Sequence, residues 1–215
     1  PFDLFYVKTP PLVPRHLRLE IGGRVDAKGS ETEPLDSSEV KRAIEELLAN
    51  DIEVLAVALY NSYANSEHER QVEQIARDMG VTLPITLSTR VVPRIGEYQR
   101  VSTTVLNAMA VPRMEEYVDD LNAAIRPPIL YMHSGAGVLP TAEVRIHPIY
   151  VAFSGPAAGA LAGREVARQV GFRNAITMDI GGTSCDICVI WNDELRYRDE
   201  IEVDWGIPAR IQSID

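Results

Sequence analysis

The sequence has few of the features that mark secreted or membrane-bound proteins. Two cysteines among 215 residues cannot form a disulfide framework, which fits a reducing compartment. The longest apolar runs, such as VLAVALY at 54–60, are much shorter than the roughly 20 residues that span a bilayer. Segment 1–15 lacks the basic-then-apolar order of a signal peptide. We therefore expect a cytoplasmic protein with no membrane partner.

Positive charge is also scarce. The chain has 21 Lys and Arg against 31 Asp and Glu, a net charge of -10 and a pI near 4.9. No dense run of basic residues reverses this locally, so the backbone of a nucleic acid would be repelled. We therefore expect that the protein does not bind nucleic acid. With 46% hydrophobic residues, the chain can bury one sizeable core or two modest ones.

The N-terminal half alternates between helix and strand patterns. Asp36 and the helical spacing of the apolar residues after it predict a capped helix over 37–50, followed by a buried strand at 53–60. Ser66 and Glu69 have the spacing of a capping box and predict the start of a second helix. A weaker strand pattern follows at 82–88.

The C-terminal half contains more strands. A long helix is predicted from Gly96 to about Ala124, with a break at Pro112 because a proline ring does not fit a helix interior. A strand and a helix rich in small residues follow, and then three strands in a β meander. These elements are expected at 129–134, 156–170, 175–180, 187–191 and 195–203.

The stretch MDIGGTSCDI at 178–187 places glycines and hydroxyl residues between two carboxylates, directly after a strand pattern. Gly181 and Gly182 would let the backbone approach a ligand closely, and Thr183 and Ser184 would add hydroxyl donors. These four residues are therefore predicted to bind phosphate. The alternative is a structural hairpin whose glycines only permit a positive φ.

Asp179 and Asp186 flank this loop. A carboxylate repels bare phosphate, but it can hold a hydrated Mg²⁺ that bridges to phosphate oxygens. We therefore predict Asp179 and Asp186 as the metal-binding residues. The sequence identifies no catalytic residue.

Other candidate residues give weaker indications. Cys185 and Cys188 are three apart at the start of a strand, so their side chains are expected to diverge and to form neither a metal site nor a disulfide. His133 is either a hydrogen-bonded loop histidine or a contact for substrate or phosphate. The remaining histidines, His16, His68 and His147, lack metal-ligand spacing.

Two longer patterns also allow more than one interpretation. The polar side chains Glu97, Arg100, Thr104 and Asn107 follow one face of the predicted helix and are typical of a solvated face, with a substrate site as the alternative. The small residues at 154–163 favour close helix packing. Anion binding at the N-terminus of that helix is a lesser alternative.

Five blocks of the sequence resemble, in the same order, blocks of the hydantoinase A / 5-oxoprolinase family, a branch of the actin-like ATPase superfamily. They are YNSYANSEHER (60–70), YQRVSTTVLNAM (98–109), YMHSGAGV (131–138), FSGPAAGA (153–160) and MDIGGTSCDI. The chain departs from the family pattern at Cys185, where the family usually has threonine. It also departs at 134–137, where SGAG replaces SNGG and an asparagine amide is lost.

The resemblance implies an α/β, actin-like (ribonuclease H-type) ATPase fold that is incomplete. Residues 1–150 would be the C-terminal part of the first α/β half. Residues 151–215 would be a crossing helix and the opening β meander of the second half, with its phosphate loop. Family members have an earlier phosphate loop and later adenosine-binding segments, which are not in this sequence, so we expect an internal fragment.

The function implied by the resemblance is ATP- and Mg²⁺-dependent phosphorylation of a cyclic amide carbonyl oxygen, which promotes ring-opening hydrolysis. One alternative is a subunit of a ketone carboxylase that acts on acetone or acetophenone, and a further alternative is a non-catalytic actin-like nucleotide-binding module. A second, hydantoinase B-type subunit or domain is the implied partner. The fragment alone is expected to be inactive.

Overall fold

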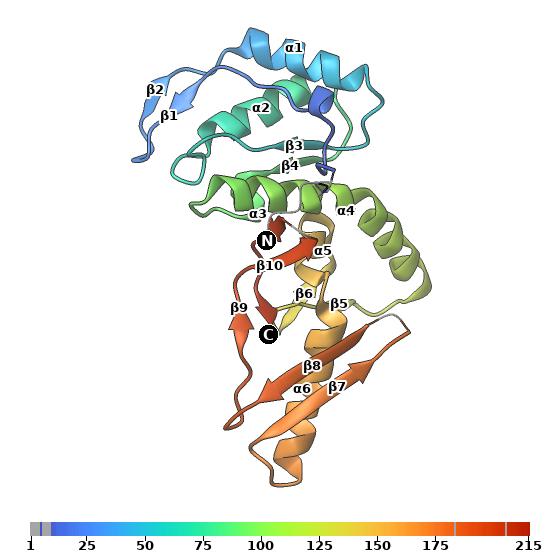
Figure 1. Cartoon of the computed structure of the whole chain (residues 1–215). Helices are drawn as coiled ribbons and strands as arrows, with labels where there is room; N and C mark the ends of the chain where they lie inside the picture. Colours follow the sequence, from blue (N-terminus) through green and yellow to red (C-terminus); the bar gives the residue numbers. More distant parts are fainter. Residues whose placement is uncertain (1–4, 6–9, 183, 205) are drawn as a thin grey trace. The chain divides into compact units, whose positions relative to one another are not determined.

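The structure is a computed structural model that describes residue 5 and residues 10–182, 184–204 and 206–215 (Figure 1). The chain forms two compact units. Unit 1 is Pro1–Ala108 with Glu202–Pro208, and unit 2 is Met109–Ile201 with Ala209–Asp215. The division therefore lies well before residue 150, and the assignment of 1–150 and 151–215 to two halves of an actin-like fold stays a prediction. None of the helices in the described ranges is long and apolar enough to cross a membrane.

Unit 1 is built around a βαβ motif. Strands β3 (Leu55–Val57) and β4 (Ile85–Leu87) pair in parallel, and helix α2 (Glu67–Asp78) connects them. Helices α1 (Ser37–Leu48) and α2 lie on the same side of the two strands (Figure 1). The buried core of this layer is aliphatic: Val40, Ile44, Leu55, Val57, Val72, Ala76, Val81 and Leu87.

The two helices of this motif begin differently. The side chain of Asp36 accepts hydrogen bonds from the backbone N–H groups of Ser38 and Glu39, which confirms the predicted cap of α1. Ser66 lies at the N-cap of α2 but makes no side-chain capping bond. The predicted capping box is wrong because Glu69 is fully buried and bonds other segments of unit 1 instead.

Shorter elements complete this part of the chain. Strands β1 (Arg24–Val25) and β2 (Glu31–Glu33) form an antiparallel pair, and β10 (Ile201–Asp204) pairs with β11 (Ile207–Ala209). A 3-10 turn, η1 (Arg15–Leu17), precedes β1, and helix α3 (Ser88–Val91) follows β4 directly.

Helix α4 (Glu97–Ala124) ends where the sequence predicted, but the predicted break at Pro112 is wrong, because the helix runs through this residue. Proline has no backbone N–H, so the carbonyl of Ala108, four residues earlier, loses its helical partner. The two units divide between Ala108 and Met109. The helical hydrogen bond that Pro112 removes would therefore end at the residue where the chain divides into its two units.

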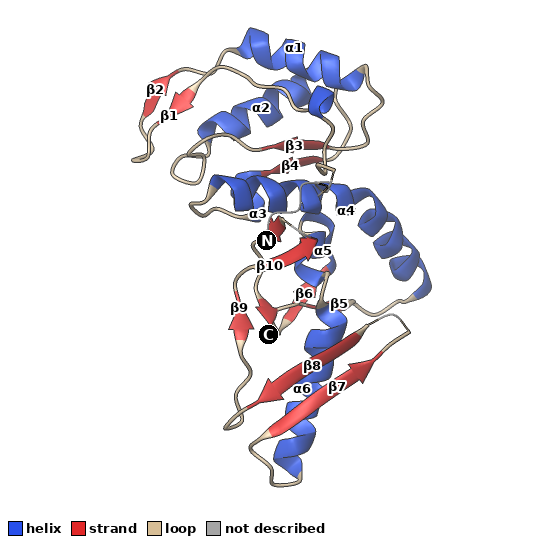
Figure 2. Cartoon of the chain, in the orientation of Figure 1, coloured by secondary structure: helices blue, strands red, loops and turns tan. Residues whose placement is uncertain are grey.

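Unit 2 contains an antiparallel hairpin of β7 (Ala175–Ile180) and β8 (Cys185–Ile190), which packs on helix α6 (Ser154–Gln169) (Figure 2). The predicted third strand at 195–203 does not join this hairpin. It is divided into β9 (Tyr197–Arg198), which pairs with β12 (Ser213–Ile214), and β10, which pairs with β11. The remaining elements are β5 (Leu130–Met132), β6 (Val138–Pro140), α5 (Thr141–Ile146) and η2 (Pro148–Val151).

The small residues of α6 allow the hairpin to approach the helix closely, as the sequence predicted. Ala157 and Ala160 are buried. A Cβ atom added at Gly163 would overlap Cγ2 of Thr177 on β7, and one at Gly159 would lie 3.9 Å from Oδ2 of Asp179. Close contact at Gly163 therefore fixes the position of β7 on the helix.

A Gly163→Ala substitution tests this packing. Alanine favours a helix over glycine by up to about 1 kcal/mol, but overlap with Thr177 costs more, so we expect a net loss of about 1–2 kcal/mol of unfolding free energy. Urea denaturation followed by circular dichroism measures it. Gly155→Ala is the matched control, since its Cβ would meet nothing within 4 Å. A Gly163→Ala protein as stable as this control would contradict the packing argument.

Candidate functional site

The tip of the β7–β8 hairpin is the loop in which the sequence predicted phosphate binding. The backbone N–H of Gly181 donates to the carbonyl of Ser184 over 3.0 Å and closes a tight turn. Neither Gly181 nor Gly182 has a positive φ, and a Cβ at Gly182 would meet nothing within 4 Å. Thr183 lies outside the described residues. The tip is therefore open at Gly182, while the N–H of Gly181 is engaged within the turn.

The two aspartates of the motif are direct cross-strand partners in the hairpin register. Side chains opposite each other in an antiparallel pair lie on the same face, with Cβ atoms about 4.5–5.5 Å apart. Both carboxylates lie on the face toward α6, where Asp179 approaches Gly159. Ser184 Oγ lies 3.4 Å from Oδ2 of Asp186. The strand pairing therefore brings together both predicted metal-binding residues and one predicted phosphate-binding hydroxyl.

This arrangement fits a hydrated divalent cation. Like charges directly opposite each other destabilise a sheet, and a cation between Asp179 and Asp186 would remove that repulsion. In the described part of the chain, no group of three or more His, Cys, Asp or Glu side chains could hold a metal. Mg²⁺ typically takes one or two carboxylates and completes its shell with water and substrate phosphate oxygens. Asp179 and Asp186 could supply the two carboxylates that this mode of Mg²⁺ binding requires.

The two cysteines lie on opposite faces of β8. Cys185 is exposed, whereas Cys188 is buried against α6 together with Ala160 and Ile190. Burial raises the pKa of the Cys188 thiol. The predicted divergence of the two side chains is confirmed.

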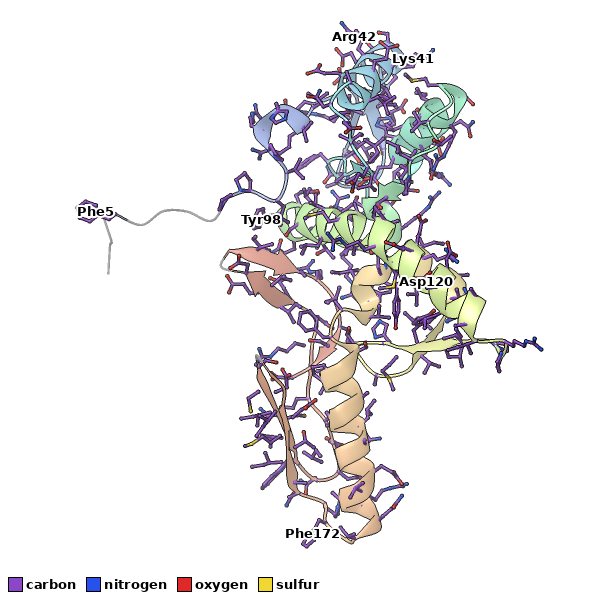
Figure 3. The ribbon with its side chains drawn as sticks, turned by 90° about the vertical axis from the view of Figure 1, so that its right-hand side faces the viewer. Phe5, Lys41, Arg42, Tyr98, Asp120 and Phe172 are labelled. Carbon is purple, nitrogen blue, oxygen red and sulfur yellow. The ribbon has the colours of Figure 1, made fainter. Side chains whose placement is uncertain are left out.

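The second face of the hairpin is apolar and exposed to solvent. Its six large side chains are between 52% and 72% exposed: Ile176, Met178, Ile180, Ile187, Val189 and Trp191. Figure 3 shows side chains of the hairpin pointing away from α6 into solvent. We call these six residues the outer hairpin face.

His133 is held in its loop by hydrogen bonding. Its Nδ1 accepts from the backbone N–H of Gly135 over 2.8 Å, and its ring lies 5.5 Å from that of Tyr150. Burial lowers the pKa of His133, which favours the neutral ring. The neighbouring Ser134 is fully buried, with Oγ bonded to the carbonyl of Tyr150. The interpretation of His133 as a hydrogen-bonded loop histidine is confirmed.

The sequence did not reveal a buried polar network around Glu69 in unit 1. This carboxylate is fully buried. Oε1 accepts from the N–H of Leu59 and lies within hydrogen-bond distance of the hydroxyls of Ser62 and Ser88, at 2.9, 2.8 and 2.6 Å. Oε2 accepts from the N–H and the hydroxyl of Thr89 at 3.0 and 2.9 Å. Glu69 therefore ties four positions outside α2 to this helix.

Arg100 supplies the countercharge of this network. It is fully buried, with Nη1 3.8 Å from Oε1 of Glu69 and Nη2 bonded to the carbonyl of Leu59 and to the carboxylate of Glu97. The interpretation of the polar stripe on α4 as a solvated face is wrong. Its members Arg100, Thr104 and Asn107 are each fully buried.

Comparison with known proteins places the chain in a family. Residues 100–215 match the hydantoinase/oxoprolinase family, and residues 1–80 match the hydantoinase/oxoprolinase N-terminal region. The chain is 36% identical over 211 residues to caprolactamase subunit alpha of Pseudomonas jessenii, with 92% of this chain and 30% of that subunit covered. It is 31% identical to the acetophenone carboxylase gamma subunit of Aromatoleum aromaticum, with 88% and 27% covered.

Solved structures agree with this placement. The crystal structure of ATP-dependent caprolactamase from Pseudomonas jessenii matches with a TM-score of 0.82 and 32% identity over 99% of this chain and 32% of that chain. Nucleotide-free acetone carboxylase gives the same TM-score at 24% identity, which is a likeness of fold. The predicted actin-like α/β class is confirmed, and the chain spans about 30% of the length of these relatives. The chain belongs to the hydantoinase/oxoprolinase family.

Proposed function

We propose that this chain is part of an ATP-dependent cyclic amide hydrolase of the hydantoinase/5-oxoprolinase type. The observation that carries the proposal is the pair of opposed carboxylates, Asp179 and Asp186, beside an open glycine tip. The similarity to the alpha subunit of a caprolactamase supports it, since that enzyme is ATP-dependent and its name gives a cyclic amide as substrate.

In the proposed reaction the carbonyl oxygen of the cyclic amide attacks the γ-phosphorus of ATP and ADP leaves. The carbon that carries the phosphorylated oxygen is then electrophilic enough for water to add. The carbon–nitrogen bond of the ring opens as the nitrogen takes a proton, and a second water hydrolyses the resulting acyl phosphate to a carboxylate and phosphate. Mg²⁺, when bound, neutralises the charge of the phosphates. Asp179 and Asp186 would position it, and Gly181, Gly182, Thr183 and Ser184 would hold phosphate oxygens. The missing Cβ at Gly182 leaves the tip open to phosphate.

A ketone carboxylase subunit is the second candidate. It is favoured by the 31% identity to the acetophenone carboxylase gamma subunit over 88% of this chain. A non-catalytic actin-like nucleotide-binding module is the further alternative. Relatives of both kinds are named as subunits, which supports a hydantoinase B-type partner. We propose the cytoplasm as the compartment.

Substrate-dependent ATP turnover by the full-length protein with its partner subunit separates these candidates. We expect caprolactam, 5-oxoproline or hydantoin to stimulate release of ADP and phosphate in the presence of Mg²⁺. The chain of 215 residues alone should release no phosphate above background, since only one phosphate loop is predicted in it and the transferred group needs donors from both halves. Stimulation only by a ketone with bicarbonate would support the carboxylase. Nucleotide binding without turnover on any of these compounds would support the module.

A further inference from the structure

A pocket of about 430 Å³ lies wholly within unit 1, between α2 and the segment that follows β4. It is lined by residues 62–66, by Arg70 of α2, and by Leu87, Thr89, Arg90 and Pro93. Its volume is in the range of sites that bind small organic molecules, about 300–1,000 Å³. Neither the glycine tip nor the aspartate pair of the hairpin contributes to it.

The lining contains cationic side chains, although the chain is strongly acidic. Two of its residues are arginines and none is Asp or Glu, although the chain has a net charge of -10. Arg90 is held by both oxygens of Glu73 at 2.7 and 2.6 Å, and Arg70 by Glu67 at 2.6 Å. These carboxylates fix the two guanidinium groups, and each guanidinium has more N–H donors than these bonds use. The pocket is therefore suited to an anion.

The other walls are apolar or held rigidly. Pro93 and the ring of Tyr63 offer surface to a hydrocarbon or aromatic body, over Leu87 of the buried core. The hydroxyls of Ser62 and Thr89 lie 2.8 and 2.9 Å from the buried carboxylate of Glu69. Because this network fixes two lining residues, the pocket is formed before any ligand arrives, which reduces the entropy lost on binding.

We propose that this pocket binds a small organic anion, with an apolar body against Tyr63 and Pro93 and its carboxylate or phosphate monoester group on Arg70 and Arg90. Both head groups match the planar fork of a guanidinium. The inference goes beyond the proposed function, because it concerns a second site in another unit and holds whether or not the hairpin binds nucleotide.

Titration of the chain with three related probes tests the proposal. Benzoate and phenyl phosphate present the two anionic groups on the same apolar body, and benzamide is a neutral relative of benzoate. At constant ionic strength we expect at least one anion to bind saturably, with a dissociation constant of about 1 mM or lower, and benzamide to bind at least about tenfold more weakly. The amide resonances of residues 62–66 and 87–90 should shift in the ¹H–¹⁵N spectrum.

Variants then assign the binding to the two arginines. Arg70→Gln and Arg90→Gln should each weaken binding of the anion at least about tenfold, as expected for a lost charge-assisted hydrogen bond. Arg42→Gln is the matched control, since this side chain is 72% exposed on α1 (Figure 3) and does not line the pocket. All three positions are on the surface, so the variants should fold.

Three results would overturn the proposal: no saturable binding of either anion, equal binding of benzamide, or equal loss of affinity in Arg42→Gln. Preference for benzoate over phenyl phosphate would identify the ligand as an organic acid, and the reverse preference would identify a phosphate monoester. Anion binding that persists in the Asp179→Asn variant of the full-length protein, while its ATP turnover is lost, would separate this site from the proposed nucleotide site.

Discussion

Replacing Glu69 with alanine is expected to lower the local unfolding free energy of unit 1 by about 3–5 kcal/mol. The substitution leaves the buried guanidinium of Arg100 without the carboxylate that lies 3.8 Å away, and it removes the acceptor for the N–H groups of Leu59 and Thr89. Native-state hydrogen exchange at the amides of β3 and β4 measures this directly. We expect exchange to accelerate at least about a hundredfold, as such a loss of stability requires.

Two further variants make this result interpretable. Glu45→Ala removes an exposed glutamate from α1 in the same unit and should change exchange by less than about 0.5 kcal/mol. Glu69→Gln keeps the shape and part of the acceptor capacity but not the charge, so it should fall between the wild type and Glu69→Ala. If Glu69→Ala and Glu45→Ala exchange at equal rates, the buried network does not stabilise unit 1.

Asp179→Asn in the full-length enzyme is expected to lower kcat for substrate-dependent ATP hydrolysis at least about a hundredfold. The amide has nearly the shape of the carboxylate, but it lacks the charge that would hold Mg²⁺ opposite Asp186. Loss of a group that stabilises the charge of phosphoryl transfer typically has an effect of about this size. Steady-state release of phosphate, measured over a range of Mg²⁺ concentrations, gives both kcat and the metal requirement.

Asp193→Asn provides the matched control for this substitution. Asp193 lies in the turn that follows β8, with φ of 66°, a conformation that asparagine also tolerates. The control should keep wild-type kcat. Unchanged turnover in Asp179→Asn, with circular dichroism confirming an intact fold, would show that the aspartate pair does not hold the metal.

Local sequence patterns predicted the elements whose stabilising contacts are also local. The cap of α1 depends on Asp36 and the two residues that follow Ser37, and all of them are adjacent in the sequence. Close packing of α6 follows from its own glycines and alanines. The divergence of Cys185 and Cys188 follows from the alternation of side chains along a strand. In each case the residues that determine the structure lie within a few positions of one another in the sequence.

Predictions failed where the deciding contacts come from distant segments. Ser66 and Glu69 have the spacing of a capping box, yet donors near residues 59 and 88 draw the carboxylate into the interior. The same network buries Arg100, which sequence periodicity alone placed on a solvated face. Likewise, the pairing partners of the segment at 195–203 lie after residue 206, so no local pattern could show that it would leave the hairpin.

The candidate site was predicted in part. The residue types of the phosphate loop and the two aspartates were apparent from the motif. The strand register added that Asp179 and Asp186 are direct partners and lie on the helix-facing side. That side could not be chosen from the sequence, because apolar residues occupy alternate positions on both strands and favour the opposite face for burial. Close approach of α6 at Gly159 and Gly163 determines the observed orientation.

The outer hairpin face has a consequence for the biosynthesis of this protein. Six large apolar side chains lie on one face of a sheet that has only two strands. The segment therefore exposes an apolar patch and also strand edges whose backbone groups have no partner strand. Transiently exposed apolar surface and unpaired strand edges make newly made chains prone to aggregate. The amount of folded protein obtained during expression will therefore depend on growth temperature and on the rate of synthesis. Both determine how long this surface stays exposed after it leaves the ribosome.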